Sequence, residues 1–241
     1  MLKKSNIKLK VNSLNDLQEL EQLLRCPDEE TIHIIGHLIG DGGVWLEPYG
    51  SRKKIYYCNN NPQLLTHFQE MFERKFKRCI HLTGGYKKNS KSILQRHDVR
   101  LVELILKYYP CCLAKHKYVP EIKERKLAKS LLKALIEDEC HEHRKGLYQF
   151  DTTSKIYAET FRKLCDFLDL KPTTVKPCLI SSGDYKSRYL YYFYFGNRKT
   201  ERYILVDTHP FCYKQLQWYD TKKRQFVKRE RVATNDKLFN V

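Results

Sequence analysis

Two apolar segments that each end in an acidic residue place the strongest constraint on this chain. The first spans residues 34–42 and carries Asp41, and the second spans 132–140 and carries Glu139, 98 positions later (139 − 41). A lysine follows each acid at almost the same interval, Lys115 after 74 residues and Lys214 after 75. The matched intervals predict a chain of two similar halves, each of which supplies one carboxylate.

The charge balance favours a polyanionic partner. The 241 residues include 45 Lys and Arg against 28 Asp and Glu, a formal net charge of +17. Such an excess costs self-repulsion in the compact state, so it is typical of proteins that bind nucleic acid. No apolar run reaches the ~18 residues of a membrane span and no signal peptide pattern opens the sequence. We therefore expect a soluble intracellular protein, in the cytoplasm or an organelle matrix, that does not enter a membrane.

The nine cysteines follow no framework spacing, so we expect small buried apolar side chains in a reducing compartment and no disulfides. One cluster of cysteines and histidines invites a zinc interpretation, but it lacks a Cys-x-x-Cys pair and the spacing does not favour a structural zinc site. Its members are Cys111, Cys112, His116, Cys140, His141 and His143.

Hydrophobic periodicity and turn residues predict a similar order of elements in both halves. In the first half we expect helices over 14–24, 28–41, 62–72 and 101–106, with hairpins formed by 44–46 and 52–58 and by 79–82 and 92–95. In the second half we expect helices over 126–136 and 154–167, a strand over 147–150 and a hairpin formed by 187–195 and 202–206. Asn61-Pro62 aligns with Thr153-Ser154 at an offset of 92. The smaller offset indicates a surface insertion of about six residues in the first half.

No low-complexity linker separates the halves, and we expect the boundary near residues 118–121. The chain therefore divides into an N-terminal half, 1–118, which begins with a helical extension, and a C-terminal half, 119–241. A strongly basic tail over 222–231 belongs to the second half.

Gly36 and Gly40 lie four residues apart and so share one face of the first acidic helix. A glycine inside a helix costs about 1 kcal/mol relative to alanine, and close approach of another helix would offset that cost. Acids at helix ends are common and often have no special role. However, Asp41 and Glu139 both face the negative C-terminal end of a helix dipole, which is unfavourable unless a cation lies close by.

A divalent cation would relieve the repulsion between two such carboxylates, and Mg²⁺ is the hard ion that oxygen ligands suit. In two-metal chemistry these ions activate a water and stabilise the leaving oxygen of a phosphodiester. An ammonium such as that of Lys115 or Lys214 would neutralise phosphate charge, although a lone lysine is usually a solvated surface group.

The two acidic segments resemble the signature helices of the LAGLIDADG homing endonucleases, in the form that carries both motifs on one chain. Shorter stretches are similar to other parts of that family: Val119-Pro120-Glu121, residues 59–64 and residues 209–214. The resemblance runs from about Ile32 to Gln215. It implies an α+β fold in which two pseudo-symmetric αββαββα LAGLIDADG units form a DNA-binding saddle of antiparallel sheets, in a monomer with an internal pseudo-twofold axis.

The same resemblance assigns roles to single residues. Asp41 and Glu139 would be the catalytic, metal-binding acids, sharing two or more Mg²⁺ ions, with the carbonyls of Gly40 and Asp138 as adjacent ligands. The catalytic basic-pocket residues would be Lys115 or Lys117 in the first half and Lys214 in the second.

Five motif positions depart from the family pattern without loss of either acid. They are His37 and Ile39 in the first motif and Ala134, Asp138 and Cys140 in the second. The second half could therefore be less ideally packed or less active, and a degenerate protein that binds without cutting stays an alternative.

Basic and aromatic residues on the predicted strands and turns are candidates for DNA contact. Some would bind phosphates and others base edges, and only the latter specify sequence. The alternative is a solvated outer strand face, which is the commoner fate of a single lysine. The candidates are Arg52, Lys53, Lys54, Tyr56, Lys87, Lys88, Lys91, Arg96, Lys186, Arg188, Arg198, Lys199 and Arg202. The aromatic run over 189–195 is interpreted as core and cross-strand packing rather than base stacking.

The leading hypothesis is a site-specific double-strand DNA homing endonuclease that hydrolyses phosphodiester bonds with divalent metal, one strand per half. The resemblance implies short 3′ overhangs and an intron-encoded origin. An RNA-binding maturase that assists intron splicing suits the charge equally. A DNA-binding regulator on the same fold is the third hypothesis, but the sequence has no added helix-turn-helix pattern. Retention of both acids favours cutting.

Overall fold

The computed structural model describes residues 14–47, 52–83, 92–114, 116–144, 147–179, 189–196, 217–220 and 225–228. Within these residues the first half contains helices and strands in the order α, α, β, β, α, β, β, α. They are α1 (Leu14–Arg25), α2 (Glu29–Ile39), β1 (Gly42–Leu46), β2 (Lys53–Asn59), α3 (Pro62–Phe76), β3 (His81–Thr83), β4 (Ser92–His97), α4 (Val99–Tyr108) and the 3₁₀ helix η1 (Pro110–Cys112). The second half contains α5 (Arg125–Glu139), β5 (Cys140–Arg144), β6 (Leu147–Thr152), α6 (Lys155–Phe167), β7 (Lys176–Leu179), β8 (Tyr189–Phe195), β9 (Gln217–Asp220) and β10 (Gln225–Lys228).

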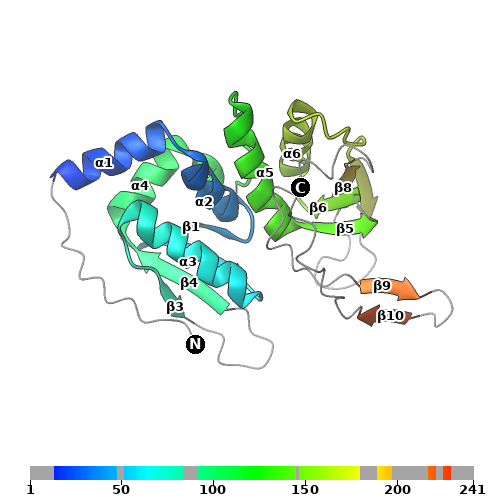
Figure 1. Cartoon of the computed structure of the whole chain (residues 1–241), viewed down its shortest axis with the longest axis horizontal. Coiled ribbons are helices and arrows are strands. Elements are labelled where there is room, and N and C mark those ends of the chain that lie inside the picture. Colours follow the sequence, from blue (N-terminus) through cyan, green and yellow to red (C-terminus); the bar gives the residue numbers. More distant parts are fainter. Residues whose placement is uncertain are drawn as a thin grey trace, which may run out of the picture.

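Each half builds one four-stranded antiparallel sheet, and the two sheets have the same topology. Their strand orders are β1-β2-β4-β3 and β5-β6-β8-β7. The two sheets lie on opposite sides of α2 and α5, which run side by side in the middle of the molecule (Figure 1). The order α2-β1-β2-α3-β3-β4 in the first half therefore recurs as α5-β5-β6-α6-β7-β8 in the second.

Short polar side chains fix where the helices begin. The Asp28 carboxylate accepts a hydrogen bond from the Thr31 amide at 2.9 Å, and Asp98 does the same for Leu101 at 3.1 Å. These side chains satisfy amide groups that the first helical turn leaves without a partner. Asn61 caps α3 and Ser154 caps α6, so the two caps correspond at an offset of 93. The expected alignment of Asn61 with Thr153 was wrong by one residue, because the side chain that accepts a hydrogen bond from the first turn of α6 is that of Ser154.

The most intimate packing in the fold joins the two acid-bearing helices. A Cβ placed on Gly36 would lie 2.6 Å from the Ala134 Cβ, and one placed on Gly40 would lie 2.6 Å from the Asp138 carboxylate. Such distances are far shorter than the ~3.5–4.0 Å of ordinary carbon contacts. The prediction that close approach of another helix explains these glycines is confirmed, and that helix is α5.

Two strands of the second sheet, β5 and β7, escaped prediction. β5 follows α5 without a turn, and β7 is an edge strand with a proline and exposed side chains that give no hydrophobic alternation. The strand over 189–195 was predicted, but it pairs with β6 on one side and β7 on the other. The partner strand expected over 202–206 lies outside the described residues, while the expected basic tail over 222–231 includes β10.

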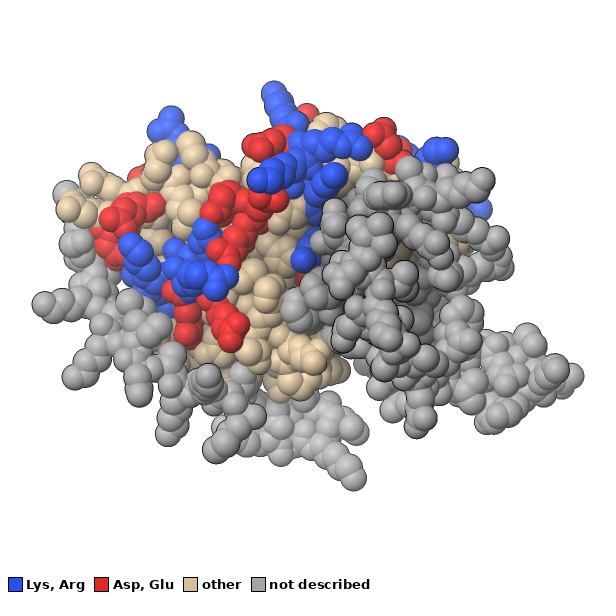
Figure 2. All heavy atoms as spheres, in the orientation of Figure 1, with Lys and Arg blue, Asp and Glu red and all other residues tan. Residues whose placement is uncertain are grey.

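Acidic and basic side chains interleave over one face of the molecule (Figure 2). The ion pairs include Arg74 with Glu30 and Lys75 with Asp28. Exposed pairs of this kind contribute little, typically about 0–1 kcal/mol each. They nevertheless balance part of the positive charge locally. None of the helices in the described part of the chain is long and apolar enough to cross a membrane.

Candidate functional site

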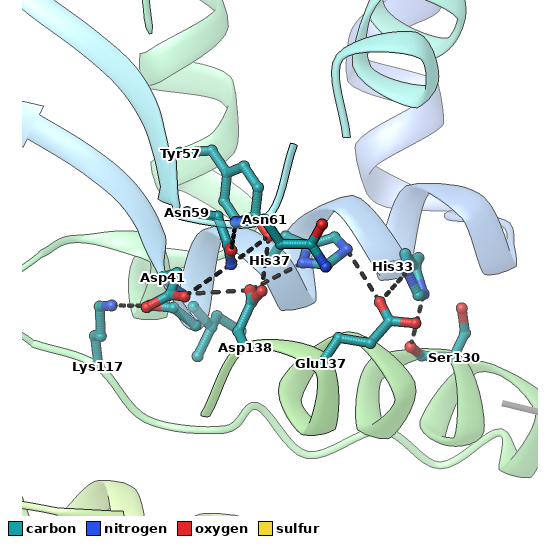
Figure 3. A network of polar contacts seen from close by, with 12 residues as sticks. His33, His37, Asp41, Tyr57, Asn59, Asn61, Lys117, Ser130, Glu137 and Asp138 are labelled. Carbon is teal, nitrogen blue, oxygen red and sulfur yellow. Dashed lines mark hydrogen bonds and ion pairs between the residues drawn. The ribbon is translucent and has the colours of Figure 1, made fainter. Parts of the chain in front are cut away.

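Asp41 lies directly after the C-terminal end of α2, where Gly40 caps the helix. Its half-buried carboxylate accepts a hydrogen bond from the Asn59 side-chain amide at 3.0 Å. Asn59 ends β2, one of the two central strands of the first sheet, so the sheet fixes the direction of the acid (Figure 3). The helix dipole places this carboxylate in negative potential, which favours a cation nearby.

The Lys117 ammonium donates a hydrogen bond to the Gly40 carbonyl oxygen, next to Asp41 in the chain. This carbonyl is one of the oxygens that the resemblance assigned to a metal ion. A cation therefore already lies at the end of α2. Lys115 and Lys214, the other two lysines expected here, lie outside the described residues.

Glu139 occupies the corresponding position at the end of α5 and is also half-buried. The fully buried phenol of Tyr157, on α6, donates a hydrogen bond to the Ile39 carbonyl at 3.4 Å. Burial raises the pKa of Tyr157, and the carboxylates of Glu139 and Asp41 raise it further. The Asp41 amide donates to the carboxylate of Asp138, the residue before Glu139, so the two helix ends lie in contact.

The side chain of Asp138 serves the helix interface. One oxygen accepts from the Tyr57 hydroxyl at 2.7 Å, while the other lies 2.9 Å from His37 Nδ1 and accepts from the Asp41 amide at 3.3 Å (Figure 3). Only 1% of Asp138 is exposed. Its carbonyl, rather than this carboxylate, was the expected metal ligand.

His37 and Asp138 are thus two of the five departures from the family pattern, and they are bonded to each other. Burial opposes charge on the His37 ring, but the carboxylates of Asp138, Glu137 and Asp41, with Asp138 contributing most, together raise the pKa of His37. An acid that looked misplaced in the second motif is therefore matched by a histidine in the first. Sequence reasoning missed this pairing because nothing in the spacing says which side chains of two helices face each other.

A second group of polar side chains lies one turn further along the same interface (Figure 3). His33 Nε2 lies 3.3 Å from one oxygen of Glu137, and His37 Nε2 lies 3.5 Å from the same oxygen. Burial lowers the pKa of His33. Burial also opposes ionisation of Glu137, but contact with His33 and His37 lowers the pKa of Glu137. The recurrence of histidine at positions 33 and 37 was the available sequence signal, since residues four apart share a helix face.

The first sheet places some predicted DNA contacts on its open face, away from the helices. Ile55 and Tyr57 of β2 are buried against the helices, so the alternate residues Lys54 and Tyr56 face the other way. Lys54 lies over the Trp45 ring, 5.0 Å from its centroid, and donates to the Gln95 side chain at 3.4 Å. Arg52 is exposed just before β2.

Lys53 and Arg96 lie on the helix-covered side instead. Lys53 forms an ion pair with Glu103 of α4. Arg96 contacts Asp98 at 3.2 Å and donates to the Cys79 carbonyl at 2.6 Å. Both side chains therefore stabilise the packing of the first half, and we do not include them in the proposed DNA surface.

The aromatic run of β8 divides between two faces. Phe193 and Phe195 are fully buried, as the interpretation of core packing required. Tyr192 and Tyr194 alternate with them and lie opposite Asp151 and Gln149 on the other face of the sheet. Core packing is therefore confirmed for Phe193 and Phe195, whereas Tyr192 and Tyr194 are half-buried and their ring centroids lie 5.9 Å apart.

Eight further candidates for DNA contact lie outside the described residues. They are Lys87, Lys88, Lys91, Lys186, Arg188, Arg198, Lys199 and Arg202. The group of possible metal ligands found among the described side chains includes none of the cysteines and histidines of the cluster around Cys111 and Cys140.

Neither a family model nor a curated protein matches the chain. Solved structures do match it. The structure of I-DmoI in complex with DNA and Mn superposes with a TM-score of 0.52 at 15% identity, covering 75% of this chain and 95% of that one. The homing endonuclease I-WcaI bound to its DNA recognition sequence gives 0.45 at 11% identity, covering 84% and 89%. The N-terminal LAGLIDADG domain of DUF199/WhiA gives 0.46 at 12% identity, covering 82% and 94%.

The assignment of the fold rests on the I-DmoI comparison, because that superposition has a TM-score of 0.52 and covers 95% of the I-DmoI chain. It agrees with the two sheets of identical topology and the central pair of close-packed helices. The expectation drawn from the two motifs is confirmed at this level: the chain has the LAGLIDADG homing endonuclease fold.

Proposed function

We propose that this protein is a site-specific DNA endonuclease that hydrolyses one phosphodiester bond on each strand with the help of divalent metal ions. The observation that carries the proposal is the contact between the C-terminal ends of α2 and α5, where the Asp41 amide donates to the carboxylate of Asp138, the residue before Glu139, at 3.3 Å. A binding protein has no need of two apposed carboxylates at the negative ends of two helices. The fold neighbour I-DmoI, which was solved with DNA and Mn, supports the same reading.

The donor groups at the two helix ends fit a hard divalent ion. Carboxylates and backbone carbonyls are the oxygen ligands that Mg²⁺ and Mn²⁺ favour. Asp41 and Glu139 would hold the ions, with the carbonyls of Gly40 and Asp138 beside them. The Lys117 ammonium at the Gly40 carbonyl indicates that this end of α2 attracts cations. A bound Mg²⁺ would lower the pKa of a water and stabilise charge on the scissile phosphate.

The protein's own side chains would orient the catalytic acid and neutralise charge on the phosphate. Asn59 holds one oxygen of Asp41 through its side-chain amide at 3.0 Å, which leaves the orientation of the acid set by β2. Lys117 places an ammonium beside the acid, where it would neutralise negative charge that develops on the phosphate as the P–O bond breaks. Tyr157 contributes a neutral phenol, because its pKa is raised.

The open faces of the two sheets would bind the duplex. Lys54 and Tyr56 on the first sheet and Tyr192 and Tyr194 on the second combine donors with flat apolar surface. Such side chains can contact phosphates and base edges in the major groove. We also propose that the halves divide at residues 118 and 119, between η1 and α5, and that one chain supplies both.

Cleavage of a randomised double-stranded DNA library in Mg²⁺ tests the proposal. We expect Asp41→Asn and Glu139→Gln each to reduce double-strand cleavage by on the order of 10²-fold or more. Glu159→Gln, which removes an exposed charge on α6, should cut like the wild type. Full double-strand cleavage by either acid variant would refute the shared site, and preferential binding of structured RNA without any cleavage would refute the nuclease.

One observation favours a second candidate, a DNA-binding protein that does not cut. The Lys117 ammonium already occupies the Gly40 carbonyl, an oxygen that the cleavage proposal assigns to a metal ion. If the ammonium remains there when DNA binds, the ions would lose one ligand. Tight, sequence-specific binding of duplex DNA with no nicking in Mg²⁺ or Mn²⁺ would select this candidate over the endonuclease.

A further inference from the structure

Three buried side chains converge between α2 and α5, apart from the acids of the proposed cleavage site. His33 and His37 share one face of α2, and Glu137 of α5 lies opposite them. The exposed fractions of these residues are 5%, 0% and 3%. One Glu137 oxygen lies 3.3 Å from His33 Nε2 and 3.5 Å from His37 Nε2, and one ligand atom from each residue falls within 4.8 Å of the others.

The converging atoms contact one another only as long ion pairs, at 3.3 and 3.5 Å. His33 Nε2, His37 Nε2 and both carboxylate oxygens of Glu137 are buried, and none of them has a well-formed hydrogen bond among the described residues. A buried polar group left unsatisfied costs about 1–3 kcal/mol, and more when it is charged. The two ring nitrogens and the Glu137 oxygen that faces both of them are therefore expensive to bury unless an ion binds them together.

The far sides of both imidazole rings are fixed. His33 Nδ1 lies 3.2 Å from the Ser130 carbonyl oxygen, and His37 Nδ1 lies 2.9 Å from the Asp138 carboxylate. Each Nδ1 can donate to its oxygen, which leaves Nε2, on the side that faces Glu137, available to bind an ion. Histidines that ligate metals are held in this way, with the second ring nitrogen bonded to a carbonyl or a carboxylate.

We propose that His33, His37 and Glu137 form a binding site for a divalent metal ion such as Zn²⁺. The bound ion would link the first half of the protein to the second. In a tetrahedral zinc site with bonds of about 2.0–2.1 Å, neighbouring ligand atoms lie roughly 3.3–3.4 Å apart. The two nitrogen-to-oxygen spacings, 3.3 and 3.5 Å, are close to that value, and the three ligand atoms, now within 4.8 Å of one another, would draw together on the ion. A water would complete the coordination.

The ligand types separate this ion from those of the cleavage site. Two imidazoles and one carboxylate suit zinc, cobalt or nickel, whereas Mg²⁺ prefers an all-oxygen shell. The two sites share one connection: Asp138 accepts from His37 and from the Asp41 amide. The role of the zinc would be structural, since all three ligands are buried in a helix interface.

Metal analysis of the full-length protein tests the proposal. The protein is expressed in zinc-supplemented medium, purified without chelator and analysed for zinc by mass spectrometry, and then stripped and reloaded with Zn²⁺ or Co²⁺. We expect about one zinc per chain, intense visible bands of four-coordinate cobalt, and a Tm raised by about 5–10 °C at a Zn²⁺ concentration 100 times the Kd.

Substitutions locate the ion. His33→Gln and Glu137→Gln should each weaken zinc binding by at least tenfold, since each removes a ligand. His81→Gln, which removes an exposed histidine on β3, and Asp41→Asn, which disables the cleavage site, should keep the zinc. Circular dichroism shows whether each variant is folded. The proposal is overturned if wild-type protein neither retains nor takes up zinc, or if both folded ligand variants bind zinc as well as the wild type.

Discussion

The contact between Gly36 and Ala134 predicts whether an alanine at position 36 stabilises or destabilises the protein. Alanine at position 36 would place a methyl group 2.6 Å from the Ala134 Cβ, at least ~1 Å inside normal contact. Such overpacking costs about 1–3 kcal/mol, while replacing a helix glycine by alanine contributes about 1 kcal/mol of stability. We therefore expect Gly36→Ala to lower the free energy of unfolding by about 0–2 kcal/mol, where an exposed helix glycine would give an increase.

A double-mutant cycle isolates the steric cost. Ala134→Gly alone should destabilise by about 1 kcal/mol through helix propensity, but in the Gly36→Ala background it should be neutral or stabilise by up to about 1 kcal/mol, because the opposing methyl group is gone. Leu131 also lies 3.2 Å from the new Cβ, so the relief is partial and a coupling of about 1–2 kcal/mol is expected. Urea denaturation gives the four free energies, and an alanine and glycine pair at exposed Lys129 calibrates propensity in α5. Stabilisation by Gly36→Ala with no coupling would refute the close approach of the helices.

Three further outcomes follow from the polar groups. Asp138→Ala should destabilise the protein by about 3–5 kcal/mol, since it leaves the His37 ring buried in the interface without its carboxylate partner. Adding His37→Leu should recover at least ~1.5 kcal/mol of the free energy of unfolding, measured by urea denaturation. Strict additivity of the two substitutions would disprove the coupling. Burial, with His33 and His37 nearby, lowers the pKa of His67 to about 4, so the unfolded chain binds a proton at His67 more readily than the folded protein does. The free energy of unfolding should therefore fall as the pH drops from about 6.5 toward 4. In His67→Gln the urea midpoint should depend less on pH over that range, and an unchanged pH profile would contradict the shift. Lys117→Gln should reduce cleavage by on the order of 10–10²-fold while the unfolding free energy changes by less than ~0.5 kcal/mol; wild-type cleavage would remove Lys117 from the site.

Local signals predicted most of the elements. Pro62 after Asn61 marked the start of α3, and the periodic leucines of α5 marked a helix that ends at Glu139. The glycines of α2 also indicated that another helix packs closely. Each of these features depends on residues within about one turn of each other, which is the range over which sequence patterns are informative.

The site was less predictable because its contacts join residues far apart in the chain. His37 and Asp138 are 101 residues apart, and their bond depends on how α2 rotates against α5. Motif reading treated both as defects of separate helices. Likewise, the parity that turns Lys54 outward and Lys53 inward follows from the register of β2 against β1 and β4, which no local pattern fixes.

The α2 and α5 interface is complementary in a way that neither half could reproduce with a copy of itself. Gly40 and Asp138 hold the same motif position, and the small residue of one helix receives the carboxylate of the other. Two copies of the second half would bring the two Asp138 carboxylates together, without the His37 ring that lies 2.9 Å from one of their oxygens. Like charges buried at that distance repel by several kcal/mol. Two copies of the first half would place each His37 ring opposite Gly40 of the other copy, where no acid is available. The departures from the family motif therefore specify a pairing between unlike halves, so a mixture of residues 1–118 and 119–241 should assemble as a heterodimer rather than as either homodimer.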